Sequence, residues 1–264
     1  MKFYAHLFVV TFLFFLFLSG CKKSDDVTDP GTTTETLSDD EVADAVAKSL
    51  VSSESGCGLS GIVNISAESS NGTVLLLQPN KSNSPNIDSF FHKTGNTTYT
   101  TYDYNLSLKI AFIKRGEEYQ IYVPTCDTAK VNIMAYGSVT AKSGRYSYND
   151  SCYLGNTYLS GISPSSDTIT LSGAAYYFST FTVTATNKTY TLATRMTFTS
   201  LKAPKSTYQI SSGTVTIDLE ATLKSGKKVN YAGGTITFTG NHNATLTFNG
   251  KTYTINLNSG SVTV

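Results

Sequence analysis

The segment 214–223 alternates between apolar and polar residues without a break. Its odd-numbered positions are all apolar, and its even-numbered positions carry threonine or a carboxylate. A period of two residues is typical of a strand with one buried and one solvated face, as in antiparallel sheets. Similar segments, separated by turn residues, fill the chain from about residue 62 onward. The sequence therefore predicts a mainly β fold: an antiparallel β-sandwich or a strongly curved β-meander, with a closed barrel as the competitor.

Three turns predict how neighbouring strands pair. Asn249-Gly250 suits a two-residue type I′ hairpin. That turn places Phe248 opposite Lys251, Leu246 opposite Tyr253 and Ala244 opposite Ile255. A second hairpin about Asn187-Lys188 places Val183 opposite Leu192 and Ala185 opposite Tyr190. A third turn, 114–117, joins the apolar positions of 106–112 to those of 119–123.

One short helix is expected near the N-terminus, over about residues 38–54. Ser38 and Glu41 form a capping-box sequence, and Ser55-Gly56 ends the helical pattern. The apolar side of this helix is expected to pack in the core and consists of Val42, Ala45, Val46, Ser49 and Leu50.

The first twenty residues have the layout of a secretory signal: Lys2, an apolar run over 7–18, and small residues before Cys21. An uncleaved membrane helix is the alternative. Leu18, Ser19, Gly20 and Cys21 resemble the lipobox of bacterial lipoproteins. The resemblance implies cleavage before Cys21 and acyl chains on its thiol. Two or more acyl chains anchor a protein stably in a membrane. The resemblance covers only the first 26 residues.

The sequence Lys22, Lys23, Ser24, Asp25 and Asp26 follows the lipid cysteine and resembles the export tag of surface lipoproteins in some diderm bacteria. We therefore expect an outer-membrane, lipid-anchored protein that is displayed on the cell surface. A periplasm-facing orientation is the alternative, in which case these residues are an ordinary solvated linker.

The expected organisation is a signal peptide (1–20), a flexible tether (21–37) and a single β-rich domain (38–264). The tether is rich in Thr, Asp and Ser and contains few apolar residues. Within the domain, three short blocks of 141–192 recur in the same order in 223–255. This similarity indicates an internal repeat with an insertion over about 149–167, and chance likeness of threonine-rich strands is the alternative.

Charge argues against nucleic acid as a partner. The chain has 20 Lys+Arg and 19 Asp+Glu, and loss of Lys2 with the signal leaves equal numbers. A chain without a basic excess has no field that attracts phosphates.

The chain has four cysteines. With Cys21 committed to lipid, Cys57, Cys126 and Cys152 remain, and an odd number allows one internal bridge. We predict that Cys126 and Cys152 form it, although spacing alone leaves Cys57 open as a partner and three free thiols as a further alternative.

Recognisable catalytic and metal-binding motifs are missing from the sequence, so we expect no catalytic residues, metal or cofactor. His92 and His242 each stand alone, without metal-ligand spacing. Asp218 and Glu220 lie two apart on one strand face, and paired acids can hydrolyse glycosidic bonds. Both belong to the polar face of a regular strand, so we expect them to be solvated.

The most suggestive candidate for binding is the inserted stretch after residue 145, which we expect to be a loop. Tyrosine gives rigid contact area, and Asn and Asp add hydrogen bonds. The candidate binding residues are Tyr146, Tyr148, Asn149, Asp150, Tyr153 and Tyr158.

Three functions fit these features. The first is a non-catalytic envelope lipoprotein whose tethered β domain binds a glycan, a protein or an envelope partner. The second is a carrier of lipid or other apolar cargo in a half-barrel, with a cavity lined by Phe238, Leu246, Phe248 and Ile255. The third is a glycan-active hydrolase. No known family is recognised in the β domain itself.

Overall fold

The computed structural model describes residues 36–51, 58–59, 87–96, 98, 100–119, 126–141, 146–183 and 187–264. Residues 35–264 form one compact unit. The elements whose bounds are described are one helix, α1 (Asp39–Leu50), and twelve strands of a single sheet. The fold is therefore mainly β with one short N-terminal helix, as the sequence predicts. Cys21 and Cys57 lie outside the described residues.

The sheet is an antiparallel meander in which consecutive strands pair with one another. The strands follow the order β1-β2-β4-β5-β6-β7-β8-β9-β10-β11-β12, and β3 pairs with β2 outside this path. Their bounds are β1 (Ile87–Asn96), β2 (Thr100–Lys114), β3 (Glu117–Tyr119), β4 (Thr128–Ala141), β5 (Tyr146–Ser160), β6 (Thr168–Val183), β7 (Lys188–Pro204), β8 (Ser212–Thr222), β9 (Lys228–Gly240), β10 (Asn243–Phe248), β11 (Lys251–Asn256) and β12 (Val262–Thr263).

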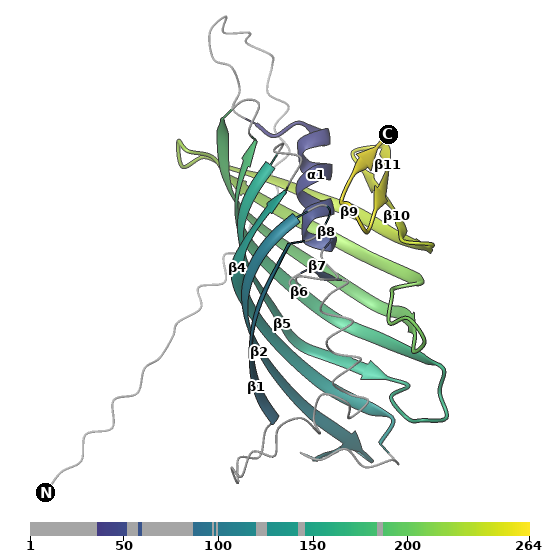
Figure 1. Cartoon of the computed structure of the whole chain (residues 1–264). Helices are drawn as coiled ribbons and strands as arrows, with labels where there is room; N and C mark the ends of the chain where they lie inside the picture. The colour runs from purple at the N-terminus through teal and green to yellow at the C-terminus, as the bar shows by residue number, and fades with distance from the viewer. Residues whose placement is uncertain are drawn as a thin grey trace, which may run out of the picture. The chain divides into compact units, whose positions relative to one another are not determined.

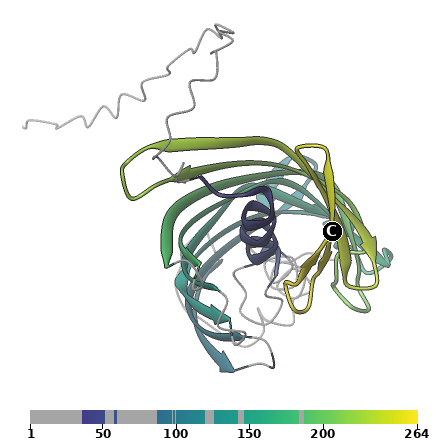
Figure 2. The ribbon, with the colours of Figure 1, turned by 90° about the horizontal axis from the view of Figure 1, so that it is seen from above.

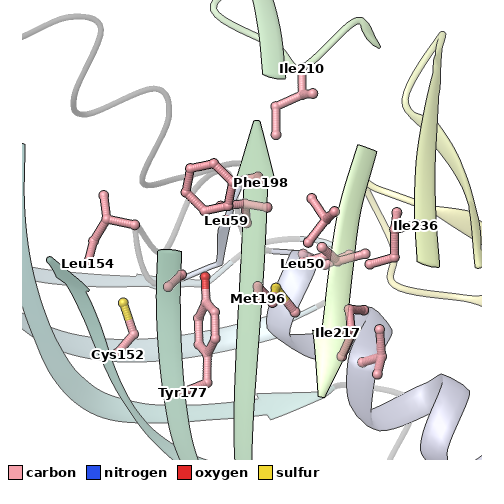
Figure 3. Packing of buried hydrophobic residues seen from close by; sticks show 14 of the residues in the cluster. Leu50, Leu59, Cys152, Leu154, Tyr177, Met196, Phe198, Ile210, Ile217 and Ile236 are labelled. Carbon is pink, nitrogen blue, oxygen red and sulfur yellow. The ribbon is translucent and has the colours of Figure 1, made fainter. Parts of the chain in front are cut away.

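The sheet curves around α1, which gives it a concave face toward the helix and a convex face away from it (Figures 1 and 2). Alternate residues of the strands point into the concave face and form one continuous apolar core with the helix. Figure 3 shows part of this core, with Leu50 of α1 near Met196, Ile217 and Ile236 of three strands. Because all described strands belong to one sheet, the architecture is the curved meander.

α1 begins at the predicted capping box. The Glu41 backbone N–H donates to Ser38 Oγ at 3.2 Å, and the Ser38 N–H donates to a Glu41 carboxylate oxygen at 2.9 Å. The helix ends at Leu50, earlier than the expected residue 54, with Val51 as its C-cap. Its buried surface is wider than the predicted stripe, because every residue from Val42 to Leu50 except Lys48 is buried. A helix that is buried nearly all round belongs to the interior of the fold.

The hairpin at Asn249-Gly250 is confirmed with its register. Phe248 pairs with Lys251, Leu246 with Tyr253 and Ala244 with Ile255. Asn249 and Gly250 have φ angles of 49° and 76°, as a type I′ turn requires. The alternation over 214–223 is also confirmed, since the apolar positions are buried from Val215 to Leu223. The turn at 114–117 is confirmed by the pairing of Lys114 with Glu117.

The predicted register of the hairpin about Asn187 is wrong. Val183 pairs with Lys188 rather than with Leu192, and Tyr190 faces Phe181 rather than Ala185. Lys188 is already the first residue of β7, so it does not occupy a turn position. A type I′ turn needs positive φ at both central residues, and in this pair only Asn187 has it, at 51°. The connection is therefore longer, and because the shift is even, each side chain keeps its face.

The recurring blocks fall at partly different places in the meander. The first block spans the β4–β5 connection in one copy and the β8–β9 connection in the other, and the third block begins β7 and β11. The second block begins β6 in the first copy but ends β9 in the second. Within the predicted insertion over about 149–167, residues 149–160 belong to β5 and add most of one strand to the first copy.

Candidate functional site

The predicted binding loop is a strand. Residues 146–160 form β5, which pairs with β4 on one side and β6 on the other. Buried and exposed side chains alternate in the second half of β5, where Cys152 and Leu154 are buried and Tyr153 is exposed. The turn-forming Asn and Gly residues conceal this alternation in the sequence. The backbone of Tyr146, Tyr148, Asn149 and Asp150 lies in β5, and their side chains lie outside the described part.

Tyr153 and Tyr158 both lie on β5 with 43% of their surface exposed. The register shifts between Gly155 and Tyr158, so a bulge separates them. Tyr158 pairs with Lys130 and Ser172, which are polar. Tyr153 pairs with Met134 and Tyr176, so it has apolar neighbours on both sides. The structure thus gives the two tyrosines different surroundings.

Tyr153 belongs to an exposed apolar surface at the middle of the convex face, which we call the aromatic platform. Strand pairing aligns its members in two adjacent rows, one through β4, β5 and β6 and one through β4 and β6. Met134, Tyr136 and Phe178 are 56%, 59% and 55% exposed. The platform consists of Met134, Tyr136, Tyr153, Tyr176 and Phe178.

The two central tyrosines of the platform stack on each other. The ring centroids of Tyr153 and Tyr176 are 6.5 Å apart, and their planes are inclined by 29°. The Tyr153 ring lies over Gly155, where an added Cβ would come within 2.5 Å of ring atoms. Arg195 of β7 continues the row, with its guanidinium carbon 5.8 Å from the Tyr176 ring centroid. Stacking and the cation–π contact hold these side chains in a defined arrangement.

An open hollow of about 360 Å³ adjoins the platform on β6–β9. Tyr176 and Phe178 form its apolar side, and its polar side carries Arg195, Asp218, Glu220 and Asn230. Glu220 makes a 2.8 Å ion pair with Lys228. Arg195 and Asp218 are cross-strand neighbours, but no ion pair joins them. Charged and amide groups therefore stand beside the aromatic rings.

Sequence reasoning missed most of this site. It named Tyr153 and, for another role, Asp218 and Glu220, but not Met134, Tyr136, Tyr176, Phe178 or Arg195. The signal was present as apolar residues on both faces of one strand: Tyr177 and Phe181 are buried, while Phe178 is exposed. An exposed apolar residue becomes significant only when strand pairing puts several side by side, and the sequence did not give those pairings.

The carboxylates of β8 do not lie in a closed cleft. Asp218 is exposed, and Glu220 carries the ion pair with Lys228. His92, which stands alone in the sequence, lies 2.8 Å from Asp103 on the next strand, and both side chains are more than half exposed. In the described ranges no group of three or more His, Cys, Asp or Glu is placed to hold a metal ion.

The concave face near the C-terminus is filled by α1. Phe238, Leu246, Phe248 and Ile255 are all buried. The space between Leu246 and Phe248 and the helix residues Val42 and Val46 is about 10 Å³. A volume of this size holds at most one water molecule. α1 therefore packs close to Leu246 and Phe248, two of the four residues expected to line a cargo cavity.

The predicted Cys126–Cys152 disulfide is wrong, because both thiols are free and buried. Cys152 pairs with Ala135 at mid-strand, whereas Cys126 precedes the first residue of β4, Thr128. Thr128 and Ala135 alone are separated by about 23 Å of strand. A disulfide requires Cα atoms within about 7 Å. Cys152 instead packs near Leu154 and Tyr177 in the core (Figure 3).

Among the described residues, no helix combines the length and the apolar character needed to cross a membrane. Comparisons with protein-family models, curated proteins and solved structures find no match for this chain.

Proposed function

We propose that this protein is a non-catalytic cell-envelope lipoprotein whose tethered β domain binds a glycan through the aromatic platform. The observation that carries the proposal is the exposed aromatic surface on the convex face, with Tyr153 and Tyr176 stacked at its centre and the polar groups of the hollow beside it. Contiguous exposed apolar patches on folded domains usually mark interaction sites.

The exposure of the platform is the first argument for a binding role. Polar threonines occupy most other convex positions of β6–β8, where Thr180, Thr191 and Thr216 are exposed. Phe178 is instead 55% exposed on the same face. A partner that covers these rings would remove apolar surface from water, at about 25 cal/mol per Å².

The chemistry of the platform favours a glycan over a protein partner. A sugar ring has an apolar C–H face and a polar rim of hydroxyls. Tyr153 and Tyr176 offer flat rings to the C–H face of the sugar. Arg195, Asp218 and Asn230 offer hydrogen-bond donors and acceptors to its hydroxyls. The centre of a protein interface is usually depleted of charge, whereas this hollow mixes both signs. Tyrosine also provides contact area at low entropic cost.

The proposed anchor is Cys21 with its acyl chains, followed by the tether 21–37. Outer-membrane placement and display on the cell surface rest on the resemblance of residues 18–26 to lipoprotein signals. The beginning of the described domain supports a tethered arrangement, because hydrogen bonds between Leu37 and Tyr231 fix the end of the tether to β9. The acyl chains contact the membrane, and the domain remains outside it.

The other two functions have less support. A carrier needs a cavity on the concave side, and the space between α1 and Leu246 and Phe248 is about 10 Å³. A hydrolase needs a nucleophile or base in a pocket, and Asp218 and Glu220 lie on an open surface. The geometry of the convex face supports binding more directly than either.

A glycan array tests the proposal. The purified protein is applied beside the double variant Tyr153→Ala/Tyr176→Ala and the control Tyr158→Ala. Tyr158 has the same exposure and lies on the same strand, but it is outside the platform. We expect wild type and control to bind the same glycans and the double variant to lose at least tenfold in affinity. Equal binding by all three proteins, or binding to no glycan, would contradict the proposal.

A further inference from the structure

We propose a second binding site, for a single uncharged sugar ring, in a cavity formed by three strand connections at one end of the sheet. The cavity, which we call the end cavity, has a volume of about 250 Å³. Its walls come from the β7–β8 connection, the β9–β10 turn and the chain after β11. This volume is just below the usual range for small-molecule sites, so it suits one small ligand.

The end cavity has an apolar floor and a polar rim. Ile210 and Leu257 form the floor and are 4% and 7% exposed. Gln209, Asn241 and Asn258, which are exposed and carry side-chain amides, also line the cavity. His242 adds a half-buried imidazole. Convergent polar groups over an apolar floor are the usual composition of a small-ligand site.

The rim groups are uncommitted. Within the described ranges, the side-chain amides of Gln209, Asn241 and Asn258 and the His242 ring make no hydrogen bond, ion pair or ring contact. By comparison, nearby Ser211 Oγ donates to the Lys202 carbonyl at 3.2 Å. Amides and an imidazole that have no protein partner can bind a ligand without breaking an existing contact.

The walls are held by the backbone, so the cavity exists before a ligand enters. The Leu257 N–H donates to the His242 carbonyl at 2.7 Å, which joins two of the three connections. The Tyr208 N–H donates to the Pro204 carbonyl at 2.7 Å within the third. Asn241 and His242 have φ angles of 50° and 58°, the values of a tight two-residue turn. A preformed site loses less entropy on binding.

The ligand class follows from the lining. No Asp, Glu, Lys or Arg is among the described residues that line the end cavity, so none of these residues compensates the charge of an acid or an amine. Amide groups both donate and accept, which matches the hydroxyls of a neutral sugar. The site is separate from the aromatic platform, since Arg195 and Pro204 are about 30 Å apart along β7.

The test titrates the purified full-length protein with glucose, galactose and N-acetylglucosamine, with saturation-transfer NMR and calorimetry as readouts. Gln209→Ala and His242→Gly remove rim groups, and glycine tolerates the positive φ at position 242. We expect saturable binding of at least one sugar and a weakening of about fivefold or more in each variant, as the loss of a hydrogen bond implies. Unfolding midpoints establish that the variants are folded.

Tyr153→Ala serves as the control, because it alters the platform and leaves the end cavity intact. Monosaccharide binding that survives Tyr153→Ala and falls in Gln209→Ala and His242→Gly would support the second site even if no glycan binds the platform. Absence of saturable binding by all three sugars would overturn the inference. Equal affinity of wild type and both rim variants, or tighter binding of glucuronate than of glucose, would also overturn it.

Discussion

Tyr231 of β9 binds both backbone polar groups of Leu37, a residue 194 positions earlier in the chain. The Leu37 N–H donates to Tyr231 Oη at 3.0 Å, and the tyrosine O–H donates to the Leu37 carbonyl at 3.1 Å. Leu37 itself is 4% exposed and immediately precedes the N-cap of α1. This pair of hydrogen bonds therefore fixes the point where the tether becomes the folded domain.

Removal of the Tyr231 hydroxyl should loosen this junction. Tyr231→Phe leaves two buried backbone groups of Leu37 without their partner, so the free energy of unfolding should fall by about 1–3 kcal/mol. Urea denaturation of the purified protein measures the change. Tyr176→Phe is the control, because the Tyr176 ring lies on the convex face and contacts Tyr153 and Arg195 through its π system. A loss in Tyr231→Phe no larger than in the control would contradict this account.

Stability should also depend on pH through the contacts between α1 and the β10–β11 hairpin. A hydrogen bond from Asn249 and, more weakly, Lys251 lower the pKa of Asp39. Burial, with a hydrogen bond that it donates to Asp40, raises the pKa of Tyr253. The hydrogen bond and charge of Asp39 raise the pKa of Lys251. The pKa of the Asp39 carboxyl is therefore lowered, and the pKa values of Tyr253 and Lys251 are raised.

The directions of these pKa shifts define a pH range in which the protein is most stable. The contribution of Asp39 is present above its unfolded pKa of 3.8 and is lost as the pH falls through the lower folded value. The contributions of Tyr253 and Lys251 to stability are present below about pH 10. They are lost as the pH rises through the raised pKa values of the folded state. We expect the urea midpoint to fall at both extremes. Asp39→Asn should flatten the acid limb, and Tyr253→Phe should flatten the alkaline limb. Unchanged limbs in these variants would assign the pH dependence to other groups.

The buried, unbridged thiols give a chemical prediction. Cys126 and Cys152 are 0% and 2% exposed. Iodoacetamide without reductant should leave both unmodified in the native protein and alkylate both in denaturant, because the thiols are inaccessible until the chain unfolds. Mass spectrometry of tryptic peptides measures the modification. A disulfide-linked peptide that contains both cysteines would show that the chain forms the bridge that the sequence alone suggests.

The lipoprotein proposal predicts where the chain is found. Cys21→Ser should abolish acylation and release the protein from the membrane fraction, because the acyl chains are the proposed anchor. Protease treatment of intact cells should digest the wild-type β domain, with lysed cells as the control and an antibody against the domain as readout. A domain that resists protease in intact cells and is digested after lysis would indicate the periplasm-facing orientation.

Local signals determined how much of the fold the sequence predicts. The capping box of Ser38 and Glu41 and the Asn249-Gly250 turn act over a few residues, and both were predicted correctly. The register at Asn187 was not, because one turn-favouring residue does not specify loop length. The incorrect disulfide has the same cause, since no short-range signal indicates where two cysteines lie along paired strands.

The candidate site depends on contacts between strands, so the sequence revealed little of it. Tyr153, Tyr176 and Arg195 belong to three different strands, and only the registers of β5–β6 and β6–β7 make them neighbours. Phe178 also stands next to buried Tyr177, which hides its exposure in a run of aromatic residues. Tyr153 was selected for its residue type, but the loop assigned to it was a strand.

Footprinting of tyrosine and phenylalanine side chains tests the central claim, that the aromatic platform is the binding surface. Hydroxyl radicals modify the protein with and without a saturating amount of the glycan that binds best on the array, and mass spectrometry locates the modified residues. The account predicts protection of Tyr136, Tyr153, Tyr176 and Phe178, with Tyr158 unchanged. Protection of Tyr158 with no change at the platform, or no protection at any of these residues, would contradict it.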